Sequence, residues 1–367
     1  MAAKLTIQDI ARLAGVSKAT VSRVLNQRTN VDPATRERVL RIMNERGFVP
    51  SVAAAGLAGG RSRIIGVLVP SLRWPLIPEI MRGIADFVED SSYEILLYSV
   101  NYEKDHSDII DRILATKLAT GLLAVLPGQS SPHLTELHNQ GFPVVVIDDQ
   151  ELPTGLPWIG TDNRLGAYTA VRHLLDLGHR RIAYIQGQAQ FLCTQQRYEG
   201  YCQALSEAGL TPVPELIRQG DFRYSSSGNA CANELFALTE RPTAIFAGND
   251  QIAYGVLMAA EHHGLRVPGD ISVVGYDDMP LSPHMRPALT TIRQPFYEMG
   301  QEAIKLLISL VELQHSTVDS GQVASPQVSS TPGNGASALH GTECIQLPIR
   351  LIMRESCGTL SQQPVSQ

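Results

Sequence analysis

The sequence predicts a small all-α head that contains a helix-turn-helix, followed by an α/β core of two doubly wound, Rossmann-like lobes. Three short segments with helix-capping residues fill the first 47 residues. From Ile64 on, short apolar runs alternate with helical stretches, which is the pattern of repeated βαβ units. About 300 residues of this pattern exceed one core of ordinary size, so we expect two lobes.

The first two helices are predicted from their capping residues. Thr6 and Asp9 have the spacing of a capping box, so a helix should run from about residue 7 to residue 14. Gly15 ends it. Ser17 caps a second helix after a three-residue turn, which is the connection of a helix-turn-helix.

A third helix follows, and the three helices can share one apolar core. Asp32 provides its N-cap and Pro33 its first residue, and it should end near Gly47. The apolar residues expected to converge are Ile10, Ala11, Val16, Val21, Leu25, Val39, Leu40 and Met43.

The second helix leaves a polar face outside this core, which suits contact with double-stranded DNA. Arg offers two donors to guanine, Ser and Thr reach phosphates or bases, and a small Ala allows close approach. Residues 1–63 hold 11 Lys or Arg against 4 Asp or Glu, whereas the rest holds 19 against 32. Only the head therefore attracts a polyanion. The candidate DNA-binding residues are Thr6, Ser17, Lys18, Ala19, Thr20, Ser22, Arg23, Asn26, Asn30, Ala54 and Leu57.

A solvated polar face on a structural helix is the simpler interpretation of any one such helix. The turn spacing, the charge of the head and its place at the start of the sequence together favour DNA. Residues 51–63 are predicted as a hinge, because their Ala-rich part is shorter than the ~12 to 15 residues of a stable isolated helix. Leu57 could wedge between base pairs in the minor groove. A plain linker is the alternative, which three nearby glycines favour.

Polar side chains gather where the predicted strands of the core end, and a ligand crevice lies at that edge of a parallel sheet. Carboxylates and amides bond to hydroxyls, while aromatic rings offer flat apolar faces, so the set suits a sugar. For any one residue, a helix cap or a packing role is an equally good interpretation. The candidate ligand-binding residues are Trp74, Leu76, Asp148, Asp162, Phe191, Cys193, Arg197, Phe222, Asn249 and Asp277.

Motifs in both parts resemble those of the LacI/GalR (lactose-repressor) family of bacterial transcription regulators. In the head, the runs TIQDIARLAGVSKATVSRVLN, VDPATRERV and GFVP occur in order. In the core, DNRLGAYTAVRHLLDLGHRRIAYI, RYEGYCQALSEAGL, FAGNDQIAYGVL and ISVVGYDDMPLSPHMRPALTTIRQP are similar to the family's regulatory core. That core is related to periplasmic sugar-binding proteins.

The resemblance implies roles for residues of the head. Lys18 and Ala19 follow the capping serine, where the family reads its operator, and Leu57 takes the place of an intercalating hinge leucine. The family's hinge usually opens with Asn and carries Arg before that leucine. This chain has Ser51, Ala55 and Gly56 there, which implies weaker ordering or different phosphate contacts.

The resemblance also implies effector contacts in the core. Arg197 of R-x-x-G-Y, Asn249 of the N-D pair and Asp277 of G-Y-D-D match positions that contact effector in the family. Phe222 falls at a position that is often aromatic. The family commonly has Asn-Pro-Phe-Phe after its first core strand, whereas this chain reads Trp-Pro-Leu-Ile from Trp74, which implies stacking by Trp74.

The expected domains follow from these features. They are a DNA-binding domain (1–50), a hinge (51–63), an N-terminal lobe (64–162 and 293–325), a C-terminal lobe (163–292 and 344–357) and an insertion (315–343). The insertion is rich in Ser, Gly, Pro and Thr and is predicted to be disordered. The closing stretch IQLPIRLIMRESC resembles the last strand of the family. The tail after Cys357 is too short for heptads, which favours a homodimer over a coiled-coil tetramer.

Composition and motifs argue against other classes. The sequence has no phosphate-binding G-x-x-x-x-G-K-[ST], no H-E-x-x-H and no G-x-S-x-G, and its five cysteines are scattered. We therefore expect no enzymatic activity, cofactor, metal or disulfide. No apolar run approaches the ~20 residues of a membrane span, and no signal-peptide pattern starts the sequence, so a cytoplasmic protein is expected.

The expected function is that of a sequence-specific DNA-binding regulator, a repressor by family default. A small carbohydrate effector bound between the two lobes should control operator binding by a homodimer. Alternatives are a purine or nucleoside effector, a protein co-regulator, a sugar-binding protein without regulatory function, or a sugar-processing enzyme.

Overall fold

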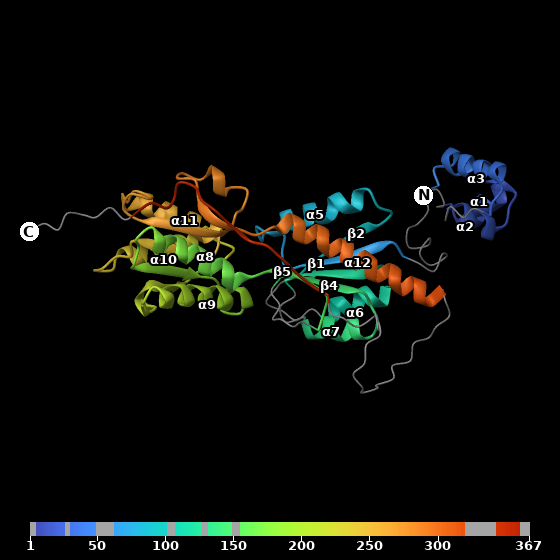
Figure 1. The fold of residues 1–367 in the computed structure, drawn as a ribbon. Helices are drawn as coiled ribbons and strands as arrows, with labels where there is room; N and C mark the ends of the chain where they lie inside the picture. The colour runs from blue at the N-terminus through green and yellow to red at the C-terminus, as the bar shows by residue number, and fades with distance from the viewer. Residues whose placement is uncertain are drawn as a thin grey trace, which may run out of the picture.

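The computed structural model describes most of the chain. The described residues are 5–25, 30–48, 62–100, 107–116, 118–126, 131–148, 155–319 and 343–359. Figure 1 shows an elongated arrangement, with the head at one end, a first lobe beside it and a second lobe at the other end. Three candidate DNA-binding residues, Asn26, Ala54 and Leu57, lie outside the described residues, and so does most of the expected hinge.

The head consists of α1 (Ile7–Ala14), α2 (Lys18–Leu25) and α3 (Pro33–Glu45). The predicted capping box is confirmed, because the Asp9 N–H donates to Thr6 Oγ1 and the Thr6 N–H donates to the Asp9 carboxylate. Gly15 ends α1 with a φ of 64°, a left-handed conformation that glycine adopts at no steric cost. The Asp32 carboxylate caps α3 by accepting from the Thr35 N–H.

One small apolar core holds these helices together. Of the eight residues predicted for it, five are buried, and Val16 and Leu25 are partly buried against them. The prediction is wrong for Leu40, which is 44% exposed. Val39 and Met43, four residues apart, form the inner face of α3, and Leu40 is turned away from it by about 100°.

The first lobe is a six-stranded parallel sheet with the strand order β11-β5-β4-β3-β1-β2. Its strands are β1 (Ile64–Val69), β2 (Glu94–Ser99), β3 (Ala119–Val125), β4 (Val144–Ile147), β5 (Trp158–Thr161) and β11 (Cys344–Leu347). Its helices are α5 (Ile77–Glu89), α6 (Ser107–Thr116), α7 (Ser131–Asn139) and α12 (Phe296–Asp319). Figure 1 shows α5 and α12 on one face and α6 and α7 on the other.

The second lobe repeats this plan with the strand order β12-β10-β9-β8-β6-β7. Its strands are β6 (Ile182–Gln186), β7 (Ile217–Gln219), β8 (Ala244–Ala247), β9 (Ser272–Asp277), β10 (Thr290–Arg293) and β12 (Arg350–Ile352). Its helices are α8 (Asn163–Asp176), α9 (Leu192–Glu207), α10 (Ser225–Phe236) and α11 (Asp250–His262), with 3₁₀ turns at Pro214–Leu216 and Ser282–His284. The pairs are parallel except that β12 is antiparallel to β10. The predicted fold class, an α-helical head and two doubly wound lobes, is confirmed.

The chain passes between the lobes three times. It crosses from β5 to α8 at Asp162, from β10 to α12 at Gln294, and from β11 to β12 after Leu347. The first two passes touch, since the Thr161 hydroxyl donates to Gln294 Oε1 at 2.6 Å. A movement of one lobe against the other must therefore act on these segments.

Three predicted features need correction. Residues 344–357 do not all belong to the second lobe, because β11 pairs with β5 and the chain crosses only near Pro348. Residues 315–319 are helical, since α12 continues to Asp319 and the Ser316 hydroxyl satisfies the Glu312 carbonyl. The apolar run YEILLYSV, residues 93–100, has the sequence pattern of a buried parallel strand, but the strand β2 that it forms is not buried, because β2 lies at the edge of the sheet and its outer residues face solvent.

Candidate functional site

One pocket draws residues from both lobes at the carboxyl ends of their strands. It is lined by Trp74, Pro75, Leu76, Leu126, Asp148, Phe191, Cys193, Arg197, Phe222, Asn249, Asp277 and Gln294. Nine of the ten candidate ligand-binding residues are among them. The tenth, Asp162, caps α8 by accepting from the Leu165 N–H at 2.8 Å and does not line the pocket. The helix-cap interpretation therefore describes Asp162.

Three aromatic rings form the apolar wall of the pocket. Trp74 precedes α5 in the first lobe, and its ring meets the edge of Phe191 from the second lobe at a centroid distance of 5.2 Å. Phe191 lies 6.0 Å from Phe222. The Phe222 ring lies so close to Gly187 that an added Cβ there would come within 2.0 Å of it. The apolar wall thus bridges the two lobes and requires a glycine behind one ring.

Arg197 on α9 is the cation of the pocket, and two of its three nitrogens already donate hydrogen bonds within the protein. Its Nε donates to Asn163 Oδ1 at 2.9 Å, and its Nη1 donates to the Gly248 carbonyl at 2.6 Å. The guanidinium lies 3.7 Å from the centroid of the Tyr276 ring, an arrangement that suits a cation–π contact. Its Nη2 lies 3.8 Å from Asp277 Oδ1. Arg197 is therefore held rigidly beside the Asp277 carboxylate.

Asp277 ends β9 and is buried, with a left-handed φ of 110°. Its Oδ1 accepts from Gln294 Nε2 at 2.8 Å. Burial raises the pKa of Asp277 to about 6, while Arg197 and the Gln294 hydrogen bond oppose that rise. The carboxylate is thus ionised near neutral pH and can accept hydrogen bonds from a ligand.

Asn249 is fixed by two contacts at the start of α11. Its Oδ1 accepts from the Ile252 N–H at 3.0 Å, which caps the helix, and its Nδ2 donates to the Phe222 carbonyl at 3.0 Å. The amide thereby joins α11 to the loop that carries Phe222. Capping and pocket lining are combined in one residue.

Pro75, Leu126 and Gln294 line the pocket but are absent from the sequence-based candidates. Gln294 follows β10, a four-residue strand without a long apolar run, so the strand end is hard to recognise. Leu126 follows β3 with a φ of 48°, and nothing in the type of residue marks it as a pocket residue.

The chemistry of the pocket favours an uncharged polar ligand with a flat apolar face. Asp148 and Asp277 supply two buried carboxyl groups, and Arg197 supplies one guanidinium, among the twelve lining residues. Ligand hydroxyls can donate to carboxylates, and the aromatic wall can pack against a ring.

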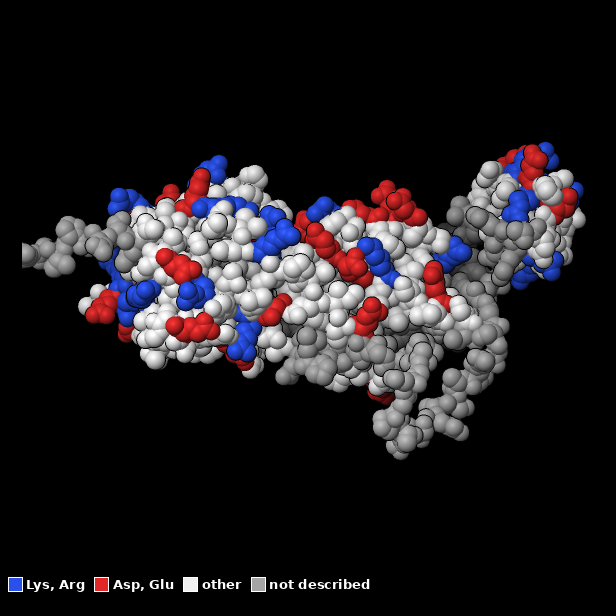
Figure 2. Space-filling model, viewed as in Figure 1, with Lys and Arg blue, Asp and Glu red and all other residues white. Residues whose placement is uncertain are grey.

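In the head, α2 presents a separate polar surface. Lys18, Ala19 and Arg23 are exposed, and Thr20 and Ser22 are half-buried. Val21 and Val24 on the same helix are buried in the core of the head. Figure 2 shows Lys and Arg side chains together with some Asp and Glu on the head, and mixed charges over the two lobes.

Other candidate residues of the head have structural partners. The Ser17 hydroxyl accepts from the Thr20 N–H at 3.1 Å and so caps α2. The Thr6 hydroxyl donates to Asp9 Oδ2 at 2.7 Å within the capping box. Asn30 is exposed in the turn before α3. Capping keeps Ser17 and Thr6 at the N-terminal ends of their helices, where backbone N–H groups favour an anion.

Comparisons with known proteins identify the family. Residues 6–51 match the bacterial regulatory proteins of the lacI family, and residues 171–333 match a periplasmic binding protein-like domain. Catabolite control protein A of Priestia megaterium is 35% identical over 323 residues, which cover 88% of this chain and 96% of that protein. The chain belongs to the LacI family.

Solved structures of similar proteins cover nearly the whole LacI-family chain. The lac repressor dimer bound to operator and the anti-inducer ONPF matches with a TM-score of 0.81 and 29% identity, over 96% of this chain and 99% of that chain. A complex of the transcriptional regulator CelR with cellobiose matches with a TM-score of 0.66 and 28% identity, over the same shares. This LacI-family protein is a DNA-binding transcription regulator with an effector-binding core. No helix within the described ranges is long and apolar enough to cross a membrane.

Proposed function

We propose that this LacI-family regulator is a repressor whose operator binding is controlled by an uncharged carbohydrate bound between the lobes. One observation carries the proposal: a pocket lined by both lobes combines two buried carboxyl groups and two buried amides with three aromatic rings. The hydroxyl rim of a sugar matches the first set, and its apolar ring face matches the second. The protein acts by binding and catalyses no reaction.

The charges of the pocket argue for a neutral sugar over a phosphorylated one. A phosphate would face Asp148 and Asp277 at short range, and Arg197 is the one Lys, Arg or His among the lining residues. The Nε and Nη1 groups of Arg197 already donate to Asn163 and Gly248. The remaining Nη2 group lies 3.8 Å from Asp277 Oδ1, so a phosphate bound there would compete with that carboxylate for the same cation.

The effector would act by favouring one arrangement of the two lobes. Trp74 belongs to the first lobe, while Phe191 and Asp277 belong to the second, so a ligand that contacts all three holds the lobes together. A ligand shifts such an equilibrium only as far as its affinities for the two arrangements differ. The changed arrangement would alter the spacing of the two heads in a dimer.

A homodimer is supported by exposed apolar side chains on the second lobe. Tyr254 and Met258 lie four residues apart on α11 and are 37% and 45% exposed, and Leu281 in the loop after β9 is 50% exposed. Exposed apolar groups of this size commonly lie at subunit interfaces. A Met258→Asp variant should dissociate at micromolar concentration in sedimentation experiments. The matched control is Met353→Asp, at a residue that is 70% exposed; equal behaviour of both variants would move the interface elsewhere.

Each head of the dimer would place α2 in a major groove, so the operator should be a near-palindrome with half-sites about one helical turn apart. Lys18, Ala19 and Arg23 on the exposed face of α2 would contact bases and phosphates, with Ser17 and Thr6 at phosphates. Leu57 would act as the minor-groove wedge. In selection from random DNA, recovery of unrelated single half-sites would contradict this arrangement.

Thermal melting of the full chain tests the effector class. The panel comprises neutral mono- and disaccharides, the same sugars as phosphates, and nucleosides. A ligand at ~100 times its dissociation constant should stabilise the core by roughly 2.7 kcal/mol. Stabilisation by a neutral sugar, lost in Asp277→Ala, supports the proposal. Stabilisation by a nucleoside or a sugar phosphate alone would replace the neutral sugar by that class.

A further inference from the structure

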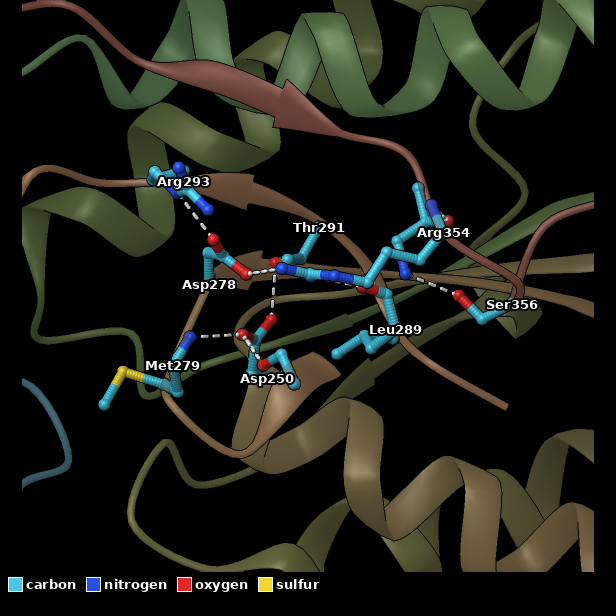
Figure 3. Close-up of polar contacts among 10 residues, drawn as sticks. Asp250, Asp278, Met279, Leu289, Thr291, Arg293, Arg354 and Ser356 are labelled. Atoms are coloured by element: carbon cyan, nitrogen blue, oxygen red, sulfur yellow. Dashed lines mark hydrogen bonds and ion pairs between the residues drawn. The ribbon is translucent and has the colours of Figure 1, made fainter. Parts of the chain in front are cut away.

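Asp278 follows the pocket residue Asp277 in the chain but does not line the pocket. Its Oδ2 accepts from Arg293 Nε at 2.6 Å, and its Oδ1 accepts from Arg354 Nη2 at 2.6 Å (Figure 3). The side chain of Asp278 is 4% exposed, so both bonds are shielded from water on the carboxylate side. Two cations therefore fix the residue that follows Asp277.

The two arginines connect Asp278 to segments on either side of the lobe crossovers. Arg293 is the last residue of β10 and immediately precedes Gln294, which bonds to Asp277. Arg354 follows β12, and its Nη1 donates to the Leu289 carbonyl at 2.7 Å. The Asp278 carboxylate thus joins the end of β9 to two segments. One is the end of β10, where the chain crosses to α12, and the other follows β12, after the chain has crossed from β11.

Met279, the residue after Asp278, is held by Asp250 at the start of α11. The Met279 N–H donates to Asp250 Oδ2 at 2.8 Å, and Asp250 Oδ1 accepts from the Thr291 hydroxyl at 2.5 Å (Figure 3). Asp277 and Asp278 both have positive φ values, 110° and 54°, which non-glycine residues seldom adopt. Side-chain contacts on both sides therefore maintain an uncommon backbone at the pocket edge.

We propose that Asp278 is a positioning residue for effector binding. By pairing with Arg293 and Arg354 it sets the direction of the Asp277 carboxylate and keeps Gln294 within reach of it. Asp278 itself contacts no ligand. The inference rests on the proposed function, since Asp277 matters here as an effector contact.

The geometry separates this role from a general contribution to stability. Arg293 is itself 52% exposed, so replacing it removes little buried surface, and Asp278 keeps one cationic partner. Arg354 stays paired with Asp278 when Arg293 is neutralised, so the fold should persist. The change should fall on the local geometry of residues 277–279 and on Gln294.

The test compares Arg293→Gln with Arg266→Gln in the full-length protein. Arg266 is 79% exposed and pairs with Asp270 on the same lobe, so it matches the loss of one charge and one ion pair. Binding of D-glucose, D-ribose and cellobiose is measured by calorimetry. In Arg293→Gln, the affinity for the sugar that the wild-type protein binds should fall by about tenfold, which is the scale of one charge-assisted hydrogen bond. In Arg266→Gln, that affinity should be unchanged. Equal affinities in both variants would overturn the proposal.

A second measurement needs no ligand and separates the two proposals. Amide hydrogen exchange at Met279 and Gln294 should be faster in Arg293→Gln than in wild type, and unchanged in Arg266→Gln. If wild type binds none of the three sugars, the neutral-sugar proposal loses support while the exchange result still decides the role of Asp278. Unchanged exchange at both amides would remove that role. Asp278→Asn, if it folds, should give the same changes with larger size.

Discussion

Gln294 lines the pocket and connects Asp277 to Thr161. Its Nε2 donates to Asp277 Oδ1 at 2.8 Å, and its Oε1 accepts from the Thr161 hydroxyl at 2.6 Å. Gln294 begins one pass between the lobes, and Thr161 ends the strand before another. A buried side-chain amide thereby joins a proposed effector contact to two of the three connections. Any shift of the Asp277 carboxylate must be followed by Gln294 or must break a buried hydrogen bond.

Replacing Gln294 by Leu should lower both stability and effector response. The substitution leaves the buried Thr161 hydroxyl and one Asp277 oxygen without this partner, which should reduce the free energy of unfolding by about 1–3 kcal/mol. Urea denaturation measures the loss. Gln301→Leu is the control, because Gln301 donates to the Tyr297 hydroxyl on α12, away from the pocket. A response to effector that persists at full size would exclude Gln294 from the coupling.

Effector affinity should fall as the pH is lowered through about 6. Burial raises the pKa of Asp277 to about 6, and ligand hydroxyls that donate to its carboxylate favour the ionised form. Binding below that pH must therefore release a proton, whereas binding above it does not. Affinity should be flat above pH 7 and about tenfold weaker at pH 5. Calorimetric titration between pH 5 and 8 measures this, and Asp277→Asn should abolish the dependence; the same slope in that variant would assign the proton to another group.

Gly187→Ala should disturb the aromatic wall. An added Cβ would come within 2.0 Å of Phe222, so the ring must move and the packing should lose about 1–3 kcal/mol. Effector affinity should fall with it, while operator binding without effector should not change. Gly269→Ala is the control, since a Cβ there meets only ordinary contacts at 3.4 Å and beyond. Thermal melting and sugar titration give the comparison, and unchanged affinity in Gly187→Ala would mean that Phe222 does not contact the ligand.

Arg23→Ala should weaken operator binding in a way that identifies its contact. If Arg23 meets a phosphate, the slope of log affinity against log salt should fall by about 1, equally for specific and random DNA. If it meets a base, discrimination should fall by about 1–3 kcal/mol at one position of the half-site. Gel-shift titrations at several salt concentrations distinguish the cases. Arg266→Ala on the second lobe is the control. Identical behaviour of the two variants would place Arg23 outside the DNA interface.

Local features of the sequence predicted the head and most strands of the lobes. Caps such as Thr6 with Asp9 act between residues three apart, so the sequence pattern is sufficient to locate them. Apolar runs such as the one in β1 indicate strands because a strand covered on both faces has no polar side. The prediction that Leu40 is buried was wrong, because an apolar residue next to a buried one can point outward on a helix.

The sequence by itself determined the class of each element, the polar strand ends and the resemblance to the LacI family. Tertiary structure alone decided that Asp162 caps a helix, that Gln294 reaches Asp277, and that β11 belongs to the first lobe. It also decided that Asp278 meets Arg354, 76 residues away in the sequence. Such pairs depend on where the crossovers place distant segments, and short-range patterns of capping and periodicity do not record that placement, because they reflect only neighbours along the chain.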